Sequence, residues 1–324
     1  MPLGTIGRQV RDGLTGTIRG AGEVVDAAVD VAEKTVTNAL RGGANITKEG
    51  TALAGTVGDA AAGAVQAAIE ASADIGGAAR GAVIGGIRGV GEITTVTAGV
   101  LSDTVRAAIK GTADVGADAG TVTQGAVSGA IEAARSTGVQ LEQASSDVAR
   151  GAITATSEVG GDLAKTARAT VSGAVEGAGE VAAQTTAVLT STARGLVRGT
   201  ADVGGDLGLV ARQTIAAAIE TSRTTGVDSI EAIRQTSRSL VQTTAEVGGD
   251  VGRVTHSTLE GTIRSARDIG LDAEQAATAA ATGALQGAEE VGQAAAEAVT
   301  GIIGTTVEGV RVAVRGRGDG QQPS

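Results

Sequence analysis

The sequence Val159-Gly160-Gly161-Asp162-Leu163 returns unchanged at Val203-Gly204-Gly205-Asp206-Leu207, 44 residues later. A looser form of this phrase, an acidic residue followed by Val or Ile and usually Gly, recurs along most of the chain. Its Val or Ile stands at positions 31, 75, 115, 159, 203, 247 and 291. The intervals are 44 residues except for one of 40, between Ile75 and Val115. The sequence therefore predicts a 44-residue internal repeat with a four-residue deletion in one copy.

Within the unit, apolar residues recur at steps of four, which is the spacing of a helix face and not the alternation of a strand. Because 44 is four times eleven, the face returns to the same side of a helix with about 3.67 residues per turn. The predicted apolar contact face consists of Val159, Leu163, Val171, Val175, Val197, Val203, Leu207, Ile215, Ile219, Val241, Val247, Val251, Leu259 and Ile263.

The charged residues of the unit fall on the other sides of the same helix. Carboxylates lie opposite the apolar arc, and arginines lie at its shoulder, where their aliphatic stems can cover apolar surface. The predicted polar face consists of Asp162, Asp206, Asp250, Glu176, Glu220, Arg194, Arg223 and Arg238. This distribution is typical of an amphipathic helix.

The composition favours helices over a β-solenoid, because Ala-rich stretches are common and there is no Pro between Pro2 and Pro323. The 52 glycines argue the other way, since each costs a helix up to about 1 kcal/mol. Either the glycines let helices approach closely, or the helices become fully ordered only on a partner surface. We predict an all-α fold of long amphipathic helices built from the 44-residue unit, as an extended rod or as stacked helical hairpins that bend at the Gly-Gly pairs.

Three segments are expected: a lead-in over 1–30, the repeat array over 31–314 and a disordered Gly/Arg tail over 315–324, which contains Arg317-Gly318-Asp319. The N-terminus shows no secretory signal. The longest stretch without a charge, Gln275–Ala288, has 14 residues, fewer than the roughly 18 of a membrane-spanning helix. We expect a cytoplasmic protein, or one peripheral to a membrane or granule, without a transmembrane span.

Whole classes of site are excluded by composition. The chain has no Phe, Trp, Tyr or Cys and a single His, His256, so thiol catalysis, disulfides, Cys/His zinc sites and aromatic stacking of bases are impossible. A net charge of −10 argues against nucleic acid as a partner. The Gly-rich stretch 85–91 lacks the Gly-Lys pair of a phosphate-binding loop. No set of acid, base and nucleophile interrupts the repeat, so we expect neither enzymatic activity, nor a metal, nor a cofactor.

The 11-residue periodicity, the long Pro-free stretches and the Ala/Val/Thr/Gly composition resemble the amphipathic-helix proteins of lipid surfaces, namely exchangeable apolipoproteins, perilipins and synucleins. The period is also similar to that of late-embryogenesis-abundant proteins, although Lys is scarce here and mean hydropathy is +0.15. The resemblance covers Val31 to about Val314. It implies a protein that coats a lipid, droplet or granule surface through its apolar face.

Two other functions fit the same sequence. The apolar face could pack on copies of the chain, which would give a self-assembling bundle or filament. The richness in Ala and Thr also suits a helical protein that protects against desiccation or ice.

Overall fold

The computed structural model describes residues 3–15, 24–42, 50–92, 94–113, 117–179 and 182–312. The chain divides into two compact units, Met1–Gly205 and Asp206–Ser324, and each is described by itself. The prediction of an all-α protein is confirmed, since the described residues form helices with only one short pair of strands. The predicted tail at 315–324 and the repeat copy at 114–116 lie outside the described residues.

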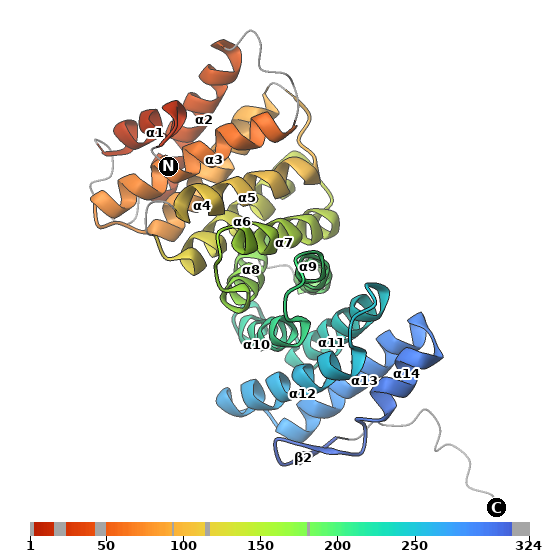
Figure 1. Ribbon diagram of the computed structural model, residues 1–324. Helices are drawn as coiled ribbons and strands as arrows, with labels where there is room; N and C mark the ends of the chain where they lie inside the picture. Colours follow the sequence, from red (N-terminus) through yellow and green to blue (C-terminus); the bar gives the residue numbers. More distant parts are fainter. Residues whose placement is uncertain are drawn as a thin grey trace, which may run out of the picture. The chain divides into compact units, whose positions relative to one another are not determined.

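Nine helices of the first unit are described (Figure 1). They are α1 (Thr5–Thr15), α2 (Val24–Gly42), α3 (Gly50–Glu70), α4 (Ile75–Gly91), α5 (Ala98–Ala113), α6 (Ala119–Thr137), α7 (Leu141–Glu158), α8 (Leu163–Ala178) and α9 (Ala182–Asp202). The described part of the second unit contains α10 (Leu207–Thr225), α11 (Ser229–Glu246), α12 (Val251–Asp268), α13 (Ala273–Val291), α14 (Gln293–Thr300), β1 (Thr306–Val307) and β2 (Val310–Arg311).

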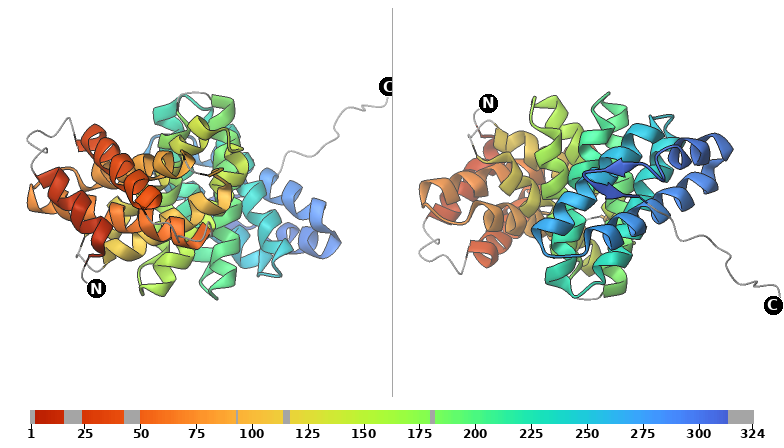
Figure 2. Two further views of the ribbon diagram at one scale, coloured as in Figure 1. Left: turned by 90° about the horizontal axis from the view of Figure 1, so that it is seen from above. Right: turned by 90° about the horizontal axis from the view of Figure 1, so that it is seen from below.

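Within each unit, most helices make their most extensive contacts with the helix two places along the chain. In the first unit, α1, α3, α5, α7 and α9 therefore form one layer, and α2, α4, α6 and α8 form a second (Figures 1 and 2). In the second unit, α10 packs on α12 and α11 on α13. Each helix covers the apolar side of its neighbour in the layer, as in helical-repeat proteins.

The described helices are 8 to 21 residues long, so none has the length of a 44-residue unit. They are short because one kind of connection keeps ending them. α7 ends before Gly160, whose backbone is left-handed (φ 69°), and the Gly161 N–H donates to the Thr156 carbonyl at 2.8 Å. Two residues after Gly160, the Asp162 carboxylate accepts hydrogen bonds from the N–H groups of Ala164 and Lys165 and caps α8.

The same Gly-x-Asp connection returns at 22-residue steps in the second unit. A left-handed Gly and a capping Asp stand at Gly226 and Asp228, at Gly248 and Asp250, and at Gly270 and Asp272. Sequence reasoning found only every second connection, because those at 226–228 and 270–272 lack the Val-Gly-Gly phrase.

The N-caps also set the register of the repeat. Asp74 precedes α4 just as Asp118 precedes α6 and Asp162 precedes α8, at intervals of 44 residues. The tripeptide Asp74-Ile75-Gly76 thus begins a helix, whereas Glu158-Val159-Gly160 ends one. This spacing of the N-caps needs no four-residue deletion.

Glycines line the contacts between helices of one layer. In α6, a Cβ atom on Gly125 would overlap the carbonyl oxygen of Gly76, and one on Gly129 would lie 2.6 Å from that of Arg80. In α13, Gly283 and Gly287 lie in the same way against the backbone of α11. Of the two explanations for the glycines, close approach of helices is therefore the one that the described packing shows.

The C-terminal end of the second unit is covered by structure that departs from the repeat. The array was expected to reach residue 314, but the chain after the short helix α14 forms an antiparallel hairpin of β1 and β2. Val299 packs in a core cluster with Val241, Ala284 and Ala288, and Arg264 holds the turn residue Glu308 at 2.7 Å. Without this cover, the last helix pair would leave apolar side chains open to solvent.

At the other end of the chain, α2 shows a polar side to solvent. Its exposed residues are Asp26, Asp30, Lys34, Asn38 and Arg41. This side of α2 therefore offers charged and amide groups, and no apolar stripe, to a neighbour.

In the connection between α3 and α4, a residue other than Gly has the left-handed backbone conformation. Ser72 occupies it with φ 52°, and the Ala73 N–H donates to the Ala68 carbonyl at 2.8 Å, as in the Gly connections. A residue with a Cβ pays about 1–2 kcal/mol in this conformation. Ser72→Gly is expected to raise the free energy of unfolding by up to about 1 kcal/mol, after the greater freedom of Gly in the unfolded chain is subtracted. Gly248→Ala should lower it by about 1 kcal/mol, and urea denaturation measures both. A destabilising Ser72→Gly would contradict this account of the connection.

The close approach of α4 and α6 can be tested with two matched Gly→Ala changes in the first unit. Gly55, inside α3, has no atom within 4 Å of its Cβ position, so Gly55→Ala should stabilise by up to about 1 kcal/mol through helix propensity alone. Gly125→Ala gains the same propensity but forces α4 and α6 apart, and we expect a net loss of about 1–3 kcal/mol. Thermal unfolding followed by circular dichroism gives both values. Equal stabilisation by the two changes would show that the helices are not in close contact.

Candidate functional site

Eight residues of the predicted apolar contact face lie inside the chain's own core. Each is at most 3% exposed: Val171, Val175, Val197, Ile215, Ile219, Val241, Leu259 and Ile263. They pack between the helices of their own unit, so they can meet an outside surface only if those helices separate.

The other six lie at the connections. Val159 and Val247 follow the last residues of α7 and α11 and are each 37% exposed. Leu163, Val203, Leu207 and Val251 are half-buried. Leu163 packs over Gly205 of the next connection, where a Cβ would lie 2.7 Å from its Cδ1, and Leu207 packs over Gly249 in the same manner. Successive connections thus stack within a unit.

Three residues of the predicted polar face are structural. Asp162, Asp206 and Asp250 are N-caps that accept backbone hydrogen bonds from the first turns of α8, α10 and α12. Such a cap stabilises a helix by about 1 kcal/mol. Asp206 also forms an ion pair with Arg253 of α12.

Glu176 and Arg238, also predicted to be polar-face residues, join helices of one layer through ion pairs. Arg80 of α4 bonds Glu132 of α6 at 2.7 Å and Glu176 of α8 at 2.6 Å. Arg238 of α11 pairs with Glu290 of α13. Sequence reasoning placed such residues on faces but missed their pairing. The available signal was a spacing of 52 residues, shared by Arg80–Glu132, Arg106–Glu158, Arg150–Asp202 and Arg238–Glu290.

The remaining predicted polar residues do not gather into a site. Arg223 and Glu220 are exposed on α10, and Arg194 is half-buried on α9.

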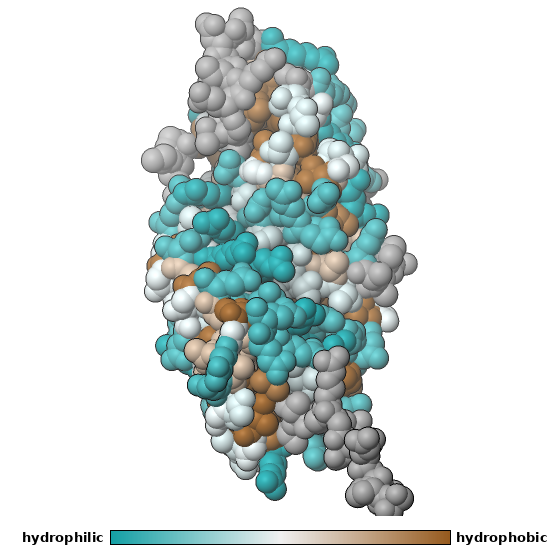
Figure 3. All heavy atoms as spheres, turned by 90° about the vertical axis from the view of Figure 1, so that its right-hand side faces the viewer, coloured by the Kyte–Doolittle hydropathy of each residue, from teal (hydrophilic) through white to brown (hydrophobic). Residues whose placement is uncertain are grey.

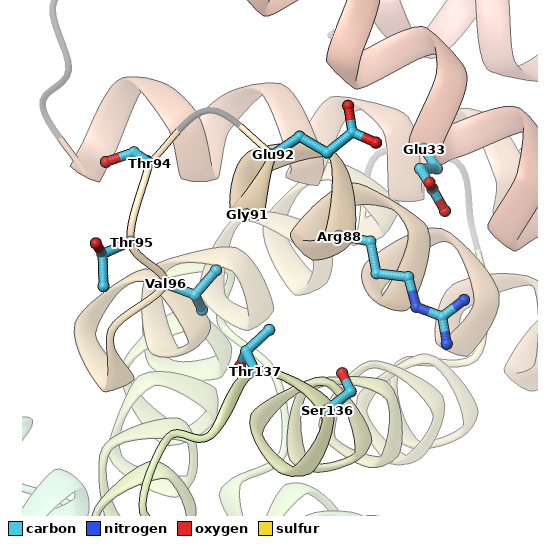
Figure 4. A pocket seen from close by; sticks show the side chains of 9 residues that line it. All are labelled: Glu33, Arg88, Gly91, Glu92, Thr94, Thr95, Val96, Ser136 and Thr137. Atoms are coloured by element: carbon cyan, nitrogen blue, oxygen red, sulfur yellow. The ribbon is translucent and has the colours of Figure 1, made fainter.

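A cleft of about 560 Å³ opens in the first unit, beside the connection between α4 and α5 (Figure 4). Arg88 extends along one side of the hollow with Ser136 below it, and Val96 and Thr137 approach each other at the other side (Figure 4). Glu33 of α2 and Glu92 at the end of α4 also line the cleft. Sequence reasoning did not find this site, because its residues come from three helices and share no spacing with the repeat.

The charges in this cleft differ in their partners. Glu92 forms an ion pair with Arg41 of α2 at 2.8 Å. The side chains of Arg88 and Glu33 make no hydrogen bond or ion pair within the described part of the chain. Arg88 belongs to the Gly-rich stretch 85–91, which lies in α4 and is therefore not a phosphate-binding loop.

The α6 hydroxyls that line the cleft are hydrogen-bonded within their own helix. The hydroxyls of Ser136 and Thr137 both donate to the Ala133 carbonyl of their own helix, at 2.9 and 2.8 Å. Among the described residues, no group of three or more His, Asp or Glu side chains is placed to hold a metal ion. In the same residues, every helix is too short or too polar to cross a bilayer.

No protein-family model matches the chain, and no curated protein matches it significantly.

Two basic residues of α5 form ion pairs with Glu158 at the end of α7. Lys110 of α5 lies 2.9 Å from its carboxylate, and Arg106 of α5 forms a second ion pair with it. The hydrogen bonds from Lys110 and Arg106 lower the pKa of the Glu158 carboxyl below its ordinary value. The ionised form is therefore favoured by the folded state.

This shift gives a pH dependence of known sign. A carboxyl whose pKa is lower in the folded chain than in the unfolded chain stabilises the fold above its unfolded pKa, about 4.3, and loses that contribution as pH falls through the folded pKa. Glu158→Gln should therefore destabilise the protein at pH 7, and the difference from the native chain should shrink between pH 4 and pH 2. Urea denaturation at pH 7, 5, 4, 3 and 2 measures it.

Glu142→Gln is the matched control, because Glu142 is exposed in the first turn of α7 and has no side-chain partner in the described residues. Its effect on stability should be small at every pH. A Glu158→Gln effect that is the same at pH 2 as at pH 7 would show that the pairing with Lys110 and Arg106 does not stabilise the fold.

Proposed function

We propose that the protein is a non-enzymatic structural scaffold built from stacked helical hairpins, each of 44 residues. The observation that carries the proposal is the burial of the repeated apolar face within the chain itself. A rod or a surface coat would present Ile215, Val241 and Leu259 outward, whereas each of them is at most 1% exposed. The ion pairs at 52-residue spacing support the same arrangement, since they link every second helix.

Coating of a lipid, droplet or granule surface is the second candidate, and one property of the core favours it. Among the described residues, ten buried Ser and Thr hydroxyls have no hydrogen-bond partner, including Thr236 and Ser237 of α11 and Thr255 and Thr258 of α12. Each unpaired buried hydroxyl lowers stability. A core with this defect opens more easily, and its helices could then spread on an apolar surface.

The folded surface itself offers less to a lipid. On the face shown in Figure 3, hydrophobic residues form small separate patches between hydrophilic ones. Five large apolar side chains are exposed among the described residues, and they lie far apart in the sequence: Ile69, Val159, Leu209, Val247 and Val291. Coating would therefore need the opened form.

Self-assembly, the other alternative, is not favoured by the surfaces of α2 and of the segment after α13. The hairpin and α14 cover the last helices, and α2 shows charges to solvent. We propose a scaffold that acts as a single copy.

Circular dichroism and flotation with anionic vesicles test the proposal on the full chain. We expect strong helicity in buffer, the same helicity with vesicles, and no protein in the floating fraction. Light scattering should give the mass of one chain, 31.3 kDa, at all concentrations. Weak helicity in buffer that rises on vesicles, together with flotation, would contradict the scaffold proposal and support coating of a lipid surface. A mass that rises with concentration would favour self-assembly.

A pair of matched variants separates scaffold from coat further. Thr258→Val removes an unpaired buried hydroxyl and should stabilise the core, whereas Ser265→Val adds an apolar group at a half-buried position of the same helix. If coating requires opening, Thr258→Val should reduce flotation and Ser265→Val should not. A scaffold predicts no flotation of either variant.

A further inference from the structure

The cleft beside the α4–α5 connection exists because that connection departs from the common design. The connections at 138–140 and 226–228 have three residues, and five others have four, whereas this one has six, from Glu92 to Thr97. Thr94 stands 22 residues after Ser72 and 44 before Gly138, where a left-handed residue would end the helix, but its backbone is not left-handed. α4 therefore ends early, and Thr97 instead caps α5 through a bond from the Val100 N–H.

The cleft also contains one basic and one acidic side chain, Arg88 and Glu33, that do not take part in the ion pairs between helices. Arg41, Arg80, Arg106 and Arg150 of the first unit each pair with an acid on another helix. Arg88 and Glu33 are free of such contacts among the described residues, although both line the same hollow. A smaller hollow of about 250 Å³, over α4 and α6, differs in this respect, since its Arg80 and Glu176 already bind each other.

The uncharged groups of the cleft favour a hydrogen-bond donor on one side and an apolar group on the other. The Ser136 and Thr137 hydroxyls donate into their own helix, so their free lone pairs can only accept hydrogen bonds from a ligand. They lie at the C-terminal end of α6, where the helix dipole favours positive charge. Val96 gives the opposite side a small apolar surface, and its side chain points into the hollow (Figure 4).

We propose that this cleft binds a free α-amino acid with a small aliphatic side chain. The guanidinium of Arg88 pairs with the α-carboxylate, which suits its forked donors. The α-ammonium is held by the Glu33 carboxylate. The side chain lies against Val96. A volume of about 560 Å³ falls within the range of small-molecule sites and leaves room for bound water.

The charge pattern argues for a zwitterion over a simple ion. An anion alone would meet Arg88 but also Glu33 and two helix C-terminal ends. A cation alone would meet Glu33 but also Arg88. Only a ligand with both charges a few ångströms apart satisfies both groups at once, and an α-amino acid is the smallest molecule of that kind.

Isothermal titration of the full chain with L-valine tests the site, with N-acetyl-L-valine and L-valinamide as probes that each lack one charge. We expect saturable binding of L-valine and a loss of about ten- to hundredfold for each probe, because each removes one charged hydrogen-bonding group. Arg88→Gln and Glu33→Gln should each weaken L-valine binding by a similar factor. Arg223→Gln, which changes an exposed Arg of the second unit, should leave it unchanged.

Several outcomes would overturn the proposal. N-acetyl-L-valine that binds as well as L-valine would make the cleft an anion site, and equal binding of L-valinamide would make it a cation site. No saturation by L-valine at 25 °C, with normal helicity, would show that the cleft holds no amino acid. An equal effect of Arg88→Gln and Arg223→Gln would place binding elsewhere. None of these results bears on the scaffold, which the vesicle and scattering measurements test.

Discussion

The close approach of helices two places apart is the contact on which the rest of the structure depends. A chain without Phe, Tyr, Trp or Cys fills its core with Ala, Val, Ile and Leu and with buried Ser and Thr. Side chains of this size close the space between helices only if the backbones come near one another. Glycines such as Gly125 and Gly129 make that possible, and their cost in helix propensity is offset by the burial that follows. The high Gly content and the absence of aromatic residues thus have one cause, which is the close packing of the helices.

Close packing also fixes the positions of the charges. Once helices of one layer are held at a constant offset, residues 52 apart come to face each other at the helix surface. The pairs Arg106–Glu158 and Arg150–Asp202 occupy equivalent places one helix pair apart. Ion pairs at such exposed sites contribute little stability each. These ion pairs favour one register of neighbouring helices, because a helix that shifted along its neighbour would separate the paired charges.

The sequence predicted the class of the fold but not the number of connections between helices. Steps of four and Ala-rich stretches were sufficient for the all-α prediction. The expected long helices are interrupted at Gly226-Val227-Asp228 and Gly270-Leu271-Asp272, which the sequence did not reveal because these connections have only the first Gly and the Asp in the places where Val159–Asp162 has them. The apolar face was drawn on one continuous helix, and so Val159 and Val247 were placed with Ile215, although the chain has already turned at the valines. A pattern of period eleven does not reveal where a helix stops, since 22 residues are also a whole number of turns.

The candidate site lay further beyond the reach of the sequence. Glu33 and Arg88 are 55 residues apart, and neither belongs to the recurring phrase. Most repeated residues of this chain have a structural role. The acids cap helices, the arginines form ion pairs between helices, and the glycines allow neighbouring helices to approach closely. A repeated position cannot change its role without weakening every contact built on it. Groups free to bind something else should therefore be found where the pattern breaks, and in the described part of the first unit the six-residue connection from Glu92 to Thr97 is such a break, with Arg88 and Glu33 beside it. The irregular connection, and not the repeat, therefore marks the place where charged side chains are available to bind a ligand.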